Sequence, residues 1–88
     1  LLIWYHHGEK HRDGDLPAYV DLYGRFAWYQ HGKLHRDNDK PAVLSLEVQE
    51  WYRDGLLHRD RNKPAVIYSY GEERYWKDGI QYWPSGNR

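Results

Sequence analysis

Three copies of the tripeptide His-Arg-Asp are the first candidates for chemistry in this sequence. They are His11-Arg12-Asp13, His35-Arg36-Asp37 and His58-Arg59-Asp60. In protein kinases this tripeptide supplies a catalytic aspartate, and an asparagine five residues later binds a metal ion. Alanine stands five residues after each aspartate here, and a chain of 88 residues is far smaller than a kinase fold. Kinase chemistry is therefore excluded.

Six histidines raise the question of a metal site. His7 and His11 are four residues apart, as are His31 and His35, a spacing that places two rings on one face of a helix. A glycine lies inside each pair and predicts a hairpin turn instead. The sequence has no cysteine and no H-E-x-x-H motif. We expect no metal and no other cofactor, and we interpret His6, His7 and His31 as solvated turn residues.

Nucleophilic catalysis has little basis in the sequence. Ser45, Ser69 and Ser85 are the three serines, and none has a nucleophile-elbow context. The carboxylates recur with a fixed period along the chain, so they are not expected to gather in one cleft. The chain is predicted not to be an enzyme.

The tripeptides belong to a longer unit, W-Y-x-x-G-x-x-H-R-D-x-[D/N]-x-P-A. Its glycines, Gly8, Gly32, Gly55 and Gly79, are 24, 23 and 24 residues apart. The unit predicts one repeat domain over 1–88, with repeats at 4–27, 28–50 and 51–74 and a partial capping repeat at 75–88. We assign structural roles to the recurring residues Trp4, Trp28, Trp51, His11, His35, His58, Asp13, Asp37, Asp60, Pro17, Pro41 and Pro64.

Each glycine ends a dipeptide that predicts a two-residue hairpin turn of type I′. The four are His7-Gly8, His31-Gly32, Asp54-Gly55 and Asp78-Gly79. This turn needs positive φ at both positions, which glycine adopts freely and which Asp or His tolerates. Counting outward, Tyr29 faces Leu34 and Trp28 faces His35. The equivalent pairs are Tyr5 with Lys10, Tyr52 with Leu57, Trp4 with His11, and Trp51 with His58.

A second strand-like run follows each Pro-Ala. Proline cannot donate to a sheet ladder, so each His-Arg-Asp-to-Pro segment is predicted to be a bulge or loop that interrupts a long strand. The runs are expected to turn back near Gly24, near Glu47-Val48 and at Gly71. Leu44, Leu46 and Val48 alternate with polar residues and are expected to share one face. The fold class is all-β: a single elongated, twisted antiparallel meander of hairpin repeats.

The unit resembles the variant of the MORN repeat (membrane occupation and recognition nexus) with the consensus Y-x-N-G-K-L-H-R-x-D-G-P-A. The copy from Trp28 to Ala42 is the most similar, although Lys40 stands where the consensus has glycine before proline. The resemblance implies an elongated sheet of hairpins whose activity is binding, usually of another protein. Proteins with such repeats come from bacteria, phages and large DNA viruses, and some are described as antitoxin-like. Association of MORN proteins with lipid has also been proposed.

Composition limits both the core and the partners. Five Trp, nine Tyr and one Phe mean that a core must be built largely from rings. Thirteen basic and thirteen acidic residues balance, which argues against a protein held on nucleic acid by net charge. No apolar run approaches the roughly 20 residues of a membrane span.

The sequence starts at Leu1 and has no methionine, which favours a processed chain or a piece of a longer one.

Alternation along the strands predicts that the Trp and Tyr rows occupy opposite faces. The Trp row is expected to be core. For the Tyr row, with Tyr19, Tyr23, Tyr68 and Tyr70, a half-exposed structural layer and a binding surface both stay open. The arginines are expected to pair with Asp13, Asp37, Asp60 or carboxylates of the adjacent repeat, in a ladder. The candidate binding face comprises Tyr5, Tyr29, Tyr52, Tyr68, Tyr70, Arg36, Arg53 and Arg59.

The predicted partner is another protein or a second copy of this chain, bound at that face or by strand addition at an open edge. We expect such a partner, a symmetry mate or upstream repeats to cover the edge near residues 1–5. The alternative is single-stranded nucleic acid, bound by stacking on the rings and by a basic stripe. That stripe would be Arg36, Arg53, Arg59 and Arg61.

Overall fold

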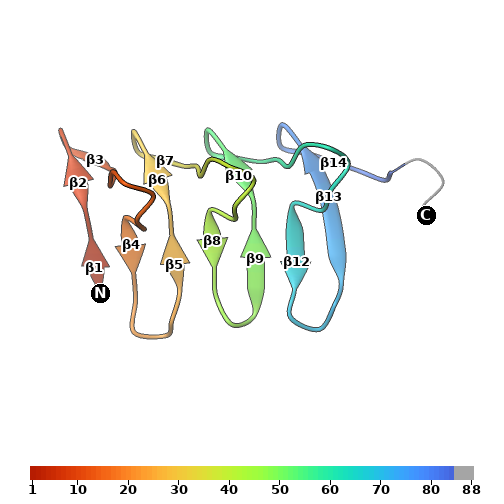
Figure 1. The fold of residues 1–88 in the computed structure, drawn as a ribbon, viewed down its shortest axis with the longest axis horizontal. Coiled ribbons are helices and arrows are strands. Elements are labelled where there is room, and N and C mark those ends of the chain that lie inside the picture. Colours follow the sequence, from red (N-terminus) through yellow and green to blue (C-terminus); the bar gives the residue numbers. More distant parts are fainter. Residues whose placement is uncertain (85–88) are drawn as a thin grey trace.

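The computed structural model describes residues 1–84, which form strands, turns and loops but no helix. Eight strands make one antiparallel sheet in the order β1-β4-β5-β8-β9-β12-β13-β14 (Figure 1). Their bounds are β1 (Leu2–Ile3), β4 (Tyr19–Val20), β5 (Phe26–Ala27), β8 (Val43–Leu44), β9 (Val48–Glu50), β12 (Val66–Tyr68), β13 (Glu73–Lys77) and β14 (Ile80–Tyr82). The predicted all-β antiparallel meander is confirmed.

Three short hairpins form separate two-stranded sheets along one border of the large sheet, uppermost in Figure 1. They are β2 (Tyr5–His6) with β3 (Glu9–Lys10), β6 (Tyr29–Gln30) with β7 (Lys33–Leu34), and β10 (Tyr52–Arg53) with β11 (Leu56–Leu57). β13 and β14 form the fourth hairpin of this row. The first two repeats thus each contain four short strands in place of the two long ones expected, whereas β13 runs without a break from the third repeat into the fourth.

The glycine turns have the predicted type I′ geometry. φ is 52° at His31 and 80° at Gly32, and the other three turns repeat these values within a few degrees. The register is also as predicted, with Tyr5 opposite Lys10, Tyr29 opposite Leu34 and Tyr52 opposite Leu57. The short turns therefore fix which side chains face one another across each hairpin.

Each Trp-His pair joins the hairpin to the large sheet. His35 N donates to Trp28 O at 3.0 Å, and Trp28 N donates to Ala42 O at 2.7 Å. The backbone of Trp28 thus accepts a hydrogen bond from His35, within the hairpin, and donates one to Ala42, next to the large sheet. Equivalent bonds link His11 to Trp4 and His58 to Trp51, so the predicted Trp-His opposition is confirmed in all three repeats.

The His-Arg-Asp-to-Pro segments are loops, as the prolines predicted. Two consecutive residues in each loop have positive φ: Gly14 and Asp15, Asn38 and Asp39, Arg61 and Asn62. Gly, Asn and Asp accept this conformation at little cost, whereas Arg61 adopts it with φ of 66° against its intrinsic preference. The loop turns Asp15 and Asp39 toward the following repeat.

Three further turns lie along the opposite border, lowermost in Figure 1. The middle turn is closed by a bond of 3.0 Å from Ser45 N to Val48 O. The prediction that Leu44, Leu46 and Val48 share a face is therefore wrong. Leu44 pairs with Gln49 across the turn, which places Val48 on the other face, and Leu46 is 87% exposed at the tip.

The core is thin and centres on the Trp row. Ala18, Ala42 and Ala65 are fully buried, and Trp28 and Trp51 are only 8% and 6% exposed. Burying one large side chain contributes about 1.5–3 kcal/mol, so these two rings dominate the apolar contribution to stability. The longest dimension of 44 Å fits four repeats that each advance the sheet by about 10 Å.

Candidate functional site

Every repeat junction contains a histidine bonded at both ring nitrogens. His35 Nε2 lies 2.8 Å from Asp37 Oδ1, and Asp54 N donates to His35 Nδ1 at 3.1 Å. Because Nδ1 accepts a backbone N–H, the neutral ring carries its proton on Nε2 and donates it to the carboxylate. His11 and His58 repeat this arrangement with the turns of the second and fourth repeats.

The histidines perturb their carboxylate neighbours. The hydrogen bond from His11 holds the pKa of Asp13 below its usual value, and His58 does the same to the pKa of Asp60. Asp13 is 89% exposed as a side chain, so its bond adds little to stability and mainly orients the ring.

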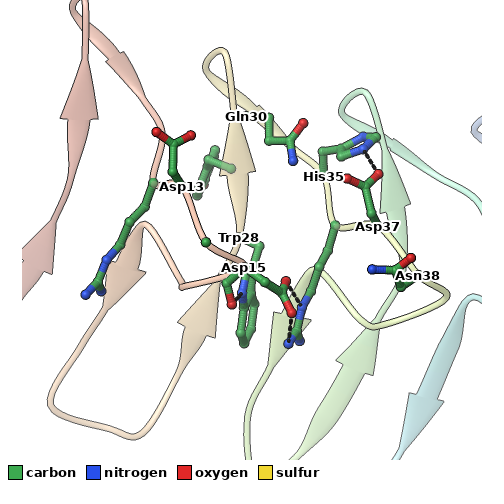
Figure 2. Close-up of a pocket in the computed structure, with 11 residues that line it drawn as sticks. Asp13, Asp15, Trp28, Gln30, His35, Asp37 and Asn38 are labelled. Carbon is green, nitrogen blue, oxygen red and sulfur yellow. Dashed lines mark hydrogen bonds and ion pairs between the residues drawn. The ribbon is translucent and has the colours of Figure 1, made fainter.

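A second junction group joins Trp28, Arg36 and Asp15 (Figure 2). The Arg36 guanidinium stacks 3.6 Å above the Trp28 ring. Its Nε and Nη2 donate to the Asp15 carboxylate at 2.9 and 3.3 Å, and its Nη1 donates to Pro41 O at 3.1 Å. Trp28 Nε1 donates to the carbonyl of Asp15 at 3.1 Å. Asp15 of the first repeat therefore satisfies both the indole and the guanidinium of the second.

The next junction repeats this group with Trp51, Arg59 and Asp39. A lysine adds a further bond at each carboxylate, Lys40 to Asp15 and Lys63 to Asp39. The bond from Arg36 holds the pKa of Asp15 below its usual value, and Arg59 does the same to the pKa of Asp39. The predicted ladder of ion pairs with the adjacent repeat is thus present. Asp13, Asp37 and Asp60 bond to the histidines of their own repeats, and Asp60 also pairs with Arg53 at 3.8 Å.

The junction between the third and fourth repeats has different residues on both of its sides. Asn62 stands where the earlier repeats have Asp15 and Asp39, and Tyr82 and Trp83 stand where they have His and Arg. Tyr82 Oη donates to Asn62 Oδ1 at 3.4 Å. The carboxylate is therefore absent where the sequence also lacks the arginine that would bind it.

The tyrosines gather on the other side of the sheet, which we call the Tyr face. It consists of Tyr19, Tyr29, Tyr52, Tyr68, Leu34, Val43, Val48 and Glu50. Of these, Tyr19, Tyr29, Leu34, Val43, Val48 and Glu50, together with Arg25 and Ala27, line an open hollow of about 400 Å³. Lys10, the cross-strand partner of Tyr5, extends over the Tyr29 ring at 4.9 Å and links Tyr5 to this surface. Tyr70 stacks on Tyr68 with ring centroids 5.3 Å apart.

Two tyrosine hydroxyls of this region donate to carboxylates. Tyr52 Oη lies 3.1 Å from Glu50 Oε1, and burial together with this carboxylate raises the pKa of Tyr52 to about 12. Tyr70 Oη lies 3.1 Å from Glu72 Oε1, and partial desolvation raises its pKa. Both phenols stay protonated near neutral pH and act as hydrogen-bond donors.

The structure does not bring the three predicted arginines to the Tyr face, so that part of the expected binding face is corrected. Arg36 and Arg59 stack on the Trp row, with side chains only 13% and 14% exposed. Arg53 neighbours Tyr52 in β10 and pairs with Asp78 at 3.3 Å. Neighbouring strand residues point to opposite sides, so an arginine next to a row tyrosine cannot share its face.

Sequence reasoning missed several exposed residues. Arg25 lines the hollow of the Tyr face, and Arg74 lies 6.0 Å from the Tyr68 ring. Leu22 and Leu46 are 90% and 87% exposed at the tips of the lower turns. Val20 pairs with Phe26 and Val66 pairs with Arg74, a register one residue away from that of a two-residue turn ending at Gly24 or Gly71. Counting outward from these glycines would therefore have placed both arginines on the wrong face.

The arrangement offers recognition chemistry: stacked rings, ion pairs and hydrogen-bond donors. Within residues 1–84 no group of three or more His, Asp or Glu side chains is placed to hold a metal ion. The same residues contain no helix long and apolar enough to cross a membrane. Ser45 Oγ forms hydrogen bonds with the backbone of its own turn.

Comparisons with family models, curated proteins and solved structures find no match to this chain.

Proposed function

We propose that this chain is a non-enzymatic module that binds another protein through the Tyr face. The observation that carries the proposal is the open hollow of about 400 Å³ between the first two repeats. Tyr29, Leu34, Val43 and Val48 stay half-buried around it, and no second layer covers them in the part of the chain that the structure describes. A sheet ordinarily buries one face against another element, so an uncovered aromatic face favours a partner.

The composition of the hollow supports a protein partner. Its lining combines aromatic rings and aliphatic side chains with the charged side chains of Arg25 and Glu50. Tyrosine and arginine are enriched at protein interfaces, which combine apolar and polar groups. The Tyr52 hydroxyl donates its single proton to Glu50, so the phenol holds this carboxylate in place beside the hollow.

The resemblance to MORN-repeat variants points the same way. On this proposal the chain is a MORN-like repeat array whose function is binding. A role as an antitoxin or inhibitor in conflict between phages and bacteria rests on the resemblance alone.

A pair of neighbouring substitutions in β7 tests the proposal. Leu34→Glu places a charge in the hollow, whereas Lys33→Glu changes the exposed neighbour. Immobilised wild-type chain should capture a protein from a cell extract, Lys33→Glu should capture it equally, and Leu34→Glu should lose it while keeping the wild-type circular dichroism spectrum. If both variants captured the protein equally well, the binding site would lie outside the hollow of the Tyr face.

Nucleic acid is the competing outcome of the same experiment. Arg36, Arg53 and Arg59 of the predicted basic stripe are all paired with carboxylates, which weakens the case for phosphate binding. Salt-sensitive binding of single-stranded oligonucleotides by both β7 variants, without any protein captured, would replace the proposal by this alternative.

A further inference from the structure

Each junction between repeats uses a histidine of the earlier repeat as a hydrogen-bond acceptor. At the first junction, between the first and second repeats, His11 Nδ1 accepts from His31 N at 3.2 Å. At the second junction, His35 Nδ1 accepts from Asp54 N at 3.1 Å. A ring nitrogen accepts a hydrogen bond only while it carries no proton, and both nitrogens of a protonated ring are donors. These bonds therefore exist only while the histidine is neutral.

The environment of the other ring nitrogen is the same at both junctions. Nε2 of His11 and Nε2 of His35 lie 2.7 and 2.8 Å from the carboxylate of the aspartate two residues later. Both rings are largely buried, with side chains only 12% and 15% exposed. A difference between the junctions in their response to acid must therefore come from the groups beside Nδ1.

The second and third junctions have a carboxylate beside Nδ1. Asp54 Oδ1 lies 3.6 Å from His35 Nδ1, and Asp78 Oδ1 lies 3.3 Å from His58 Nδ1. A proton added to Nδ1 thus has an acceptor in the same turn residue whose amide it displaces. The two repeats remain joined in either protonation state of the histidine.

The first junction has imidazole rings where the other junctions have this carboxylate. His31 occupies the turn position, and its ring centroid lies 5.0 Å from that of His11, while the ring of His6 lies 5.5 Å from His11. Two carboxylates are near. Asp13 is bonded to Nε2 of His11, and Glu9 Oε1 lies 3.8 Å from His31 Nδ1.

Neither carboxylate compensates a proton on Nδ1 of His11. The side chains of His31 and Glu9 are 76% and 54% exposed, so an ion pair between them contributes little to holding the repeats together. The added proton of His11 faces no free carboxylate within residues 1–84, and its charge lies beside two further rings that also bind protons in acid.

We propose that the first junction is an acid-sensitive switch, which is closed while His11 is neutral and opens when His11 is protonated, whereas the second and third junctions stay closed. The closed junction binds one proton fewer than the open junction, so acid favours the open form. An imidazole in water titrates near about pH 6.5, so the closed form predominates well above that value and is lost as the pH falls below it.

Opening separates the hairpin β2-β3 from the hairpin β6-β7. It breaks the bond from His31 N to His11 and the neighbouring bond from Gly32 N to Lys10 O, which is 3.0 Å long. The switch regulates the geometry of the repeat array, and it acts whether or not the Tyr face binds a protein.

Nuclear Overhauser cross-peaks of the 88-residue chain test the switch. A methyl group added at Gly32 would lie 3.7 Å from Glu9 Cβ, and one added at Gly55 would lie 3.6 Å from Lys33 Cβ. The α protons of each glycine should therefore give a cross-peak to that side chain. Both cross-peaks should be present at about pH 7.5, and at about pH 5 the cross-peak of Gly32 should be lost while that of Gly55 persists.

Exchanging the two turn residues provides matched variants. His31→Asp gives the first junction the carboxylate that it lacks, and Asp54→His removes the carboxylate from the second. φ is 52° at His31 and 51° at Asp54, so the chain already accommodates both residue types in this conformation. At about pH 5, His31→Asp should retain the Gly32 cross-peak and Asp54→His should lose the Gly55 cross-peak.

Three results would overturn the switch. In the wild-type chain at about pH 5, these are loss of both cross-peaks and retention of both, because the proposal places opening of the first junction alone in this range. The third is loss of the Gly32 cross-peak in His31→Asp, because the turn carboxylate would then not control the junction. Failure of one variant to fold leaves the other variant and the wild-type chain as complete tests.

Discussion

Arg36 of the second repeat and Asp15 of the first are joined by two hydrogen bonds, of 2.9 and 3.3 Å, across 21 residues of sequence. The same guanidinium covers Trp28 of the Trp row, on the side of the sheet opposite the Tyr face. The Arg36 side chain therefore forms the ion pair between the two repeats and also helps to bury the Trp28 ring within its own repeat. Stability is shared between neighbouring repeats, as expected for a linear array in which each unit contacts only the next.

Removing the arginine should cost more than removing its carboxylate partner. Arg36→Ala loses the stack on Trp28, the bond to Pro41 O and the pair with Asp15, and we expect a loss of about 2 kcal/mol in the free energy of unfolding. Asp15→Asn keeps the stack, and its side chain is 40% exposed, so we expect about 1 kcal/mol or less. Urea denaturation measures both.

Arg61→Ala is the matched control for Arg36→Ala. Arg61 is exposed and forms no ion pair within residues 1–84, so its loss should change stability by less than about 0.5 kcal/mol. Equal effects of the two arginine substitutions would mean that the stacked guanidinium contributes nothing beyond its charge.

The sequence predicted the short-range geometry of this fold because hairpin turns are local. The dipeptide His31-Gly32 has one favourable turn type, and that turn alone fixes Tyr29 opposite Leu34. The loop after His-Arg-Asp was likewise predictable from Pro41, which cannot donate to a ladder.

Side-chain contacts between neighbouring repeats could not be predicted in the same way, because they depend on how one repeat is positioned against the next. Asp15 meets Arg36 only because the loop turns its carboxylate toward the next repeat, and no count along one hairpin gives that contact. The recurrence of Asp or Asn seven residues after Gly8, Gly32 and Gly55 was visible, but its partner was not. The prediction of the Tyr face was correct in part. The tyrosines do lie together, but Arg36 and Arg59, which stack on the Trp row, were wrongly grouped with them.

The two Trp of the core should be far more sensitive than the exposed Trp83. Trp51→Ala removes a ring that is 6% exposed and should cost about 3–5 kcal/mol, enough to unfold much of so small a domain. Trp83 is 64% exposed, so Trp83→Ala should cost less than about 0.5 kcal/mol. Thermal denaturation followed by circular dichroism compares them. Similar melting curves for the two variants would contradict the assignment of the Trp row to the core.

Two turn glycines in the terminal repeats should respond differently to alanine. Gly8 and Gly79 have φ of 80° and 81°, so either substitution should cost about 1 kcal/mol through backbone strain. A Cβ at Gly79 would also approach Leu56 Cδ2 to 3.2 Å, whereas a Cβ at Gly8 meets no atom within 4 Å. Gly79→Ala should therefore cost roughly 1 kcal/mol more than Gly8→Ala in urea denaturation. The reverse order would show that the hairpins do not stack as described.

Acid should weaken the junctions. Asp15 and Asp39 have pKa values held below the usual 3.8 by Arg36 and Arg59. The unfolded chain therefore takes up protons at these carboxyls at higher pH than the folded chain does. Their contribution is fully present well above pH 3.8 and is lost as pH falls through that value and below it.

Urea denaturation between about pH 6 and about pH 2.5 measures this loss. The double variant Asp15→Asn and Asp39→Asn should be less stable near neutral pH and should depend less steeply on pH in the acid range. An acid limb as steep as that of the wild-type chain would show that these two carboxyls are not the groups responsible.

The stacking of repeats in register is tested most directly by the hydrogen bond from Asp54 N to His35 Nδ1, 3.1 Å long, which joins the second repeat to the third. Nuclear magnetic resonance of the ¹⁵N-labelled chain detects scalar coupling through such a bond. We predict a cross-peak between the Asp54 amide nitrogen and His35 Nδ1, with the ring proton on Nε2. A His35 ring protonated on Nδ1 in its neutral form, with no coupling to Asp54, would contradict the account.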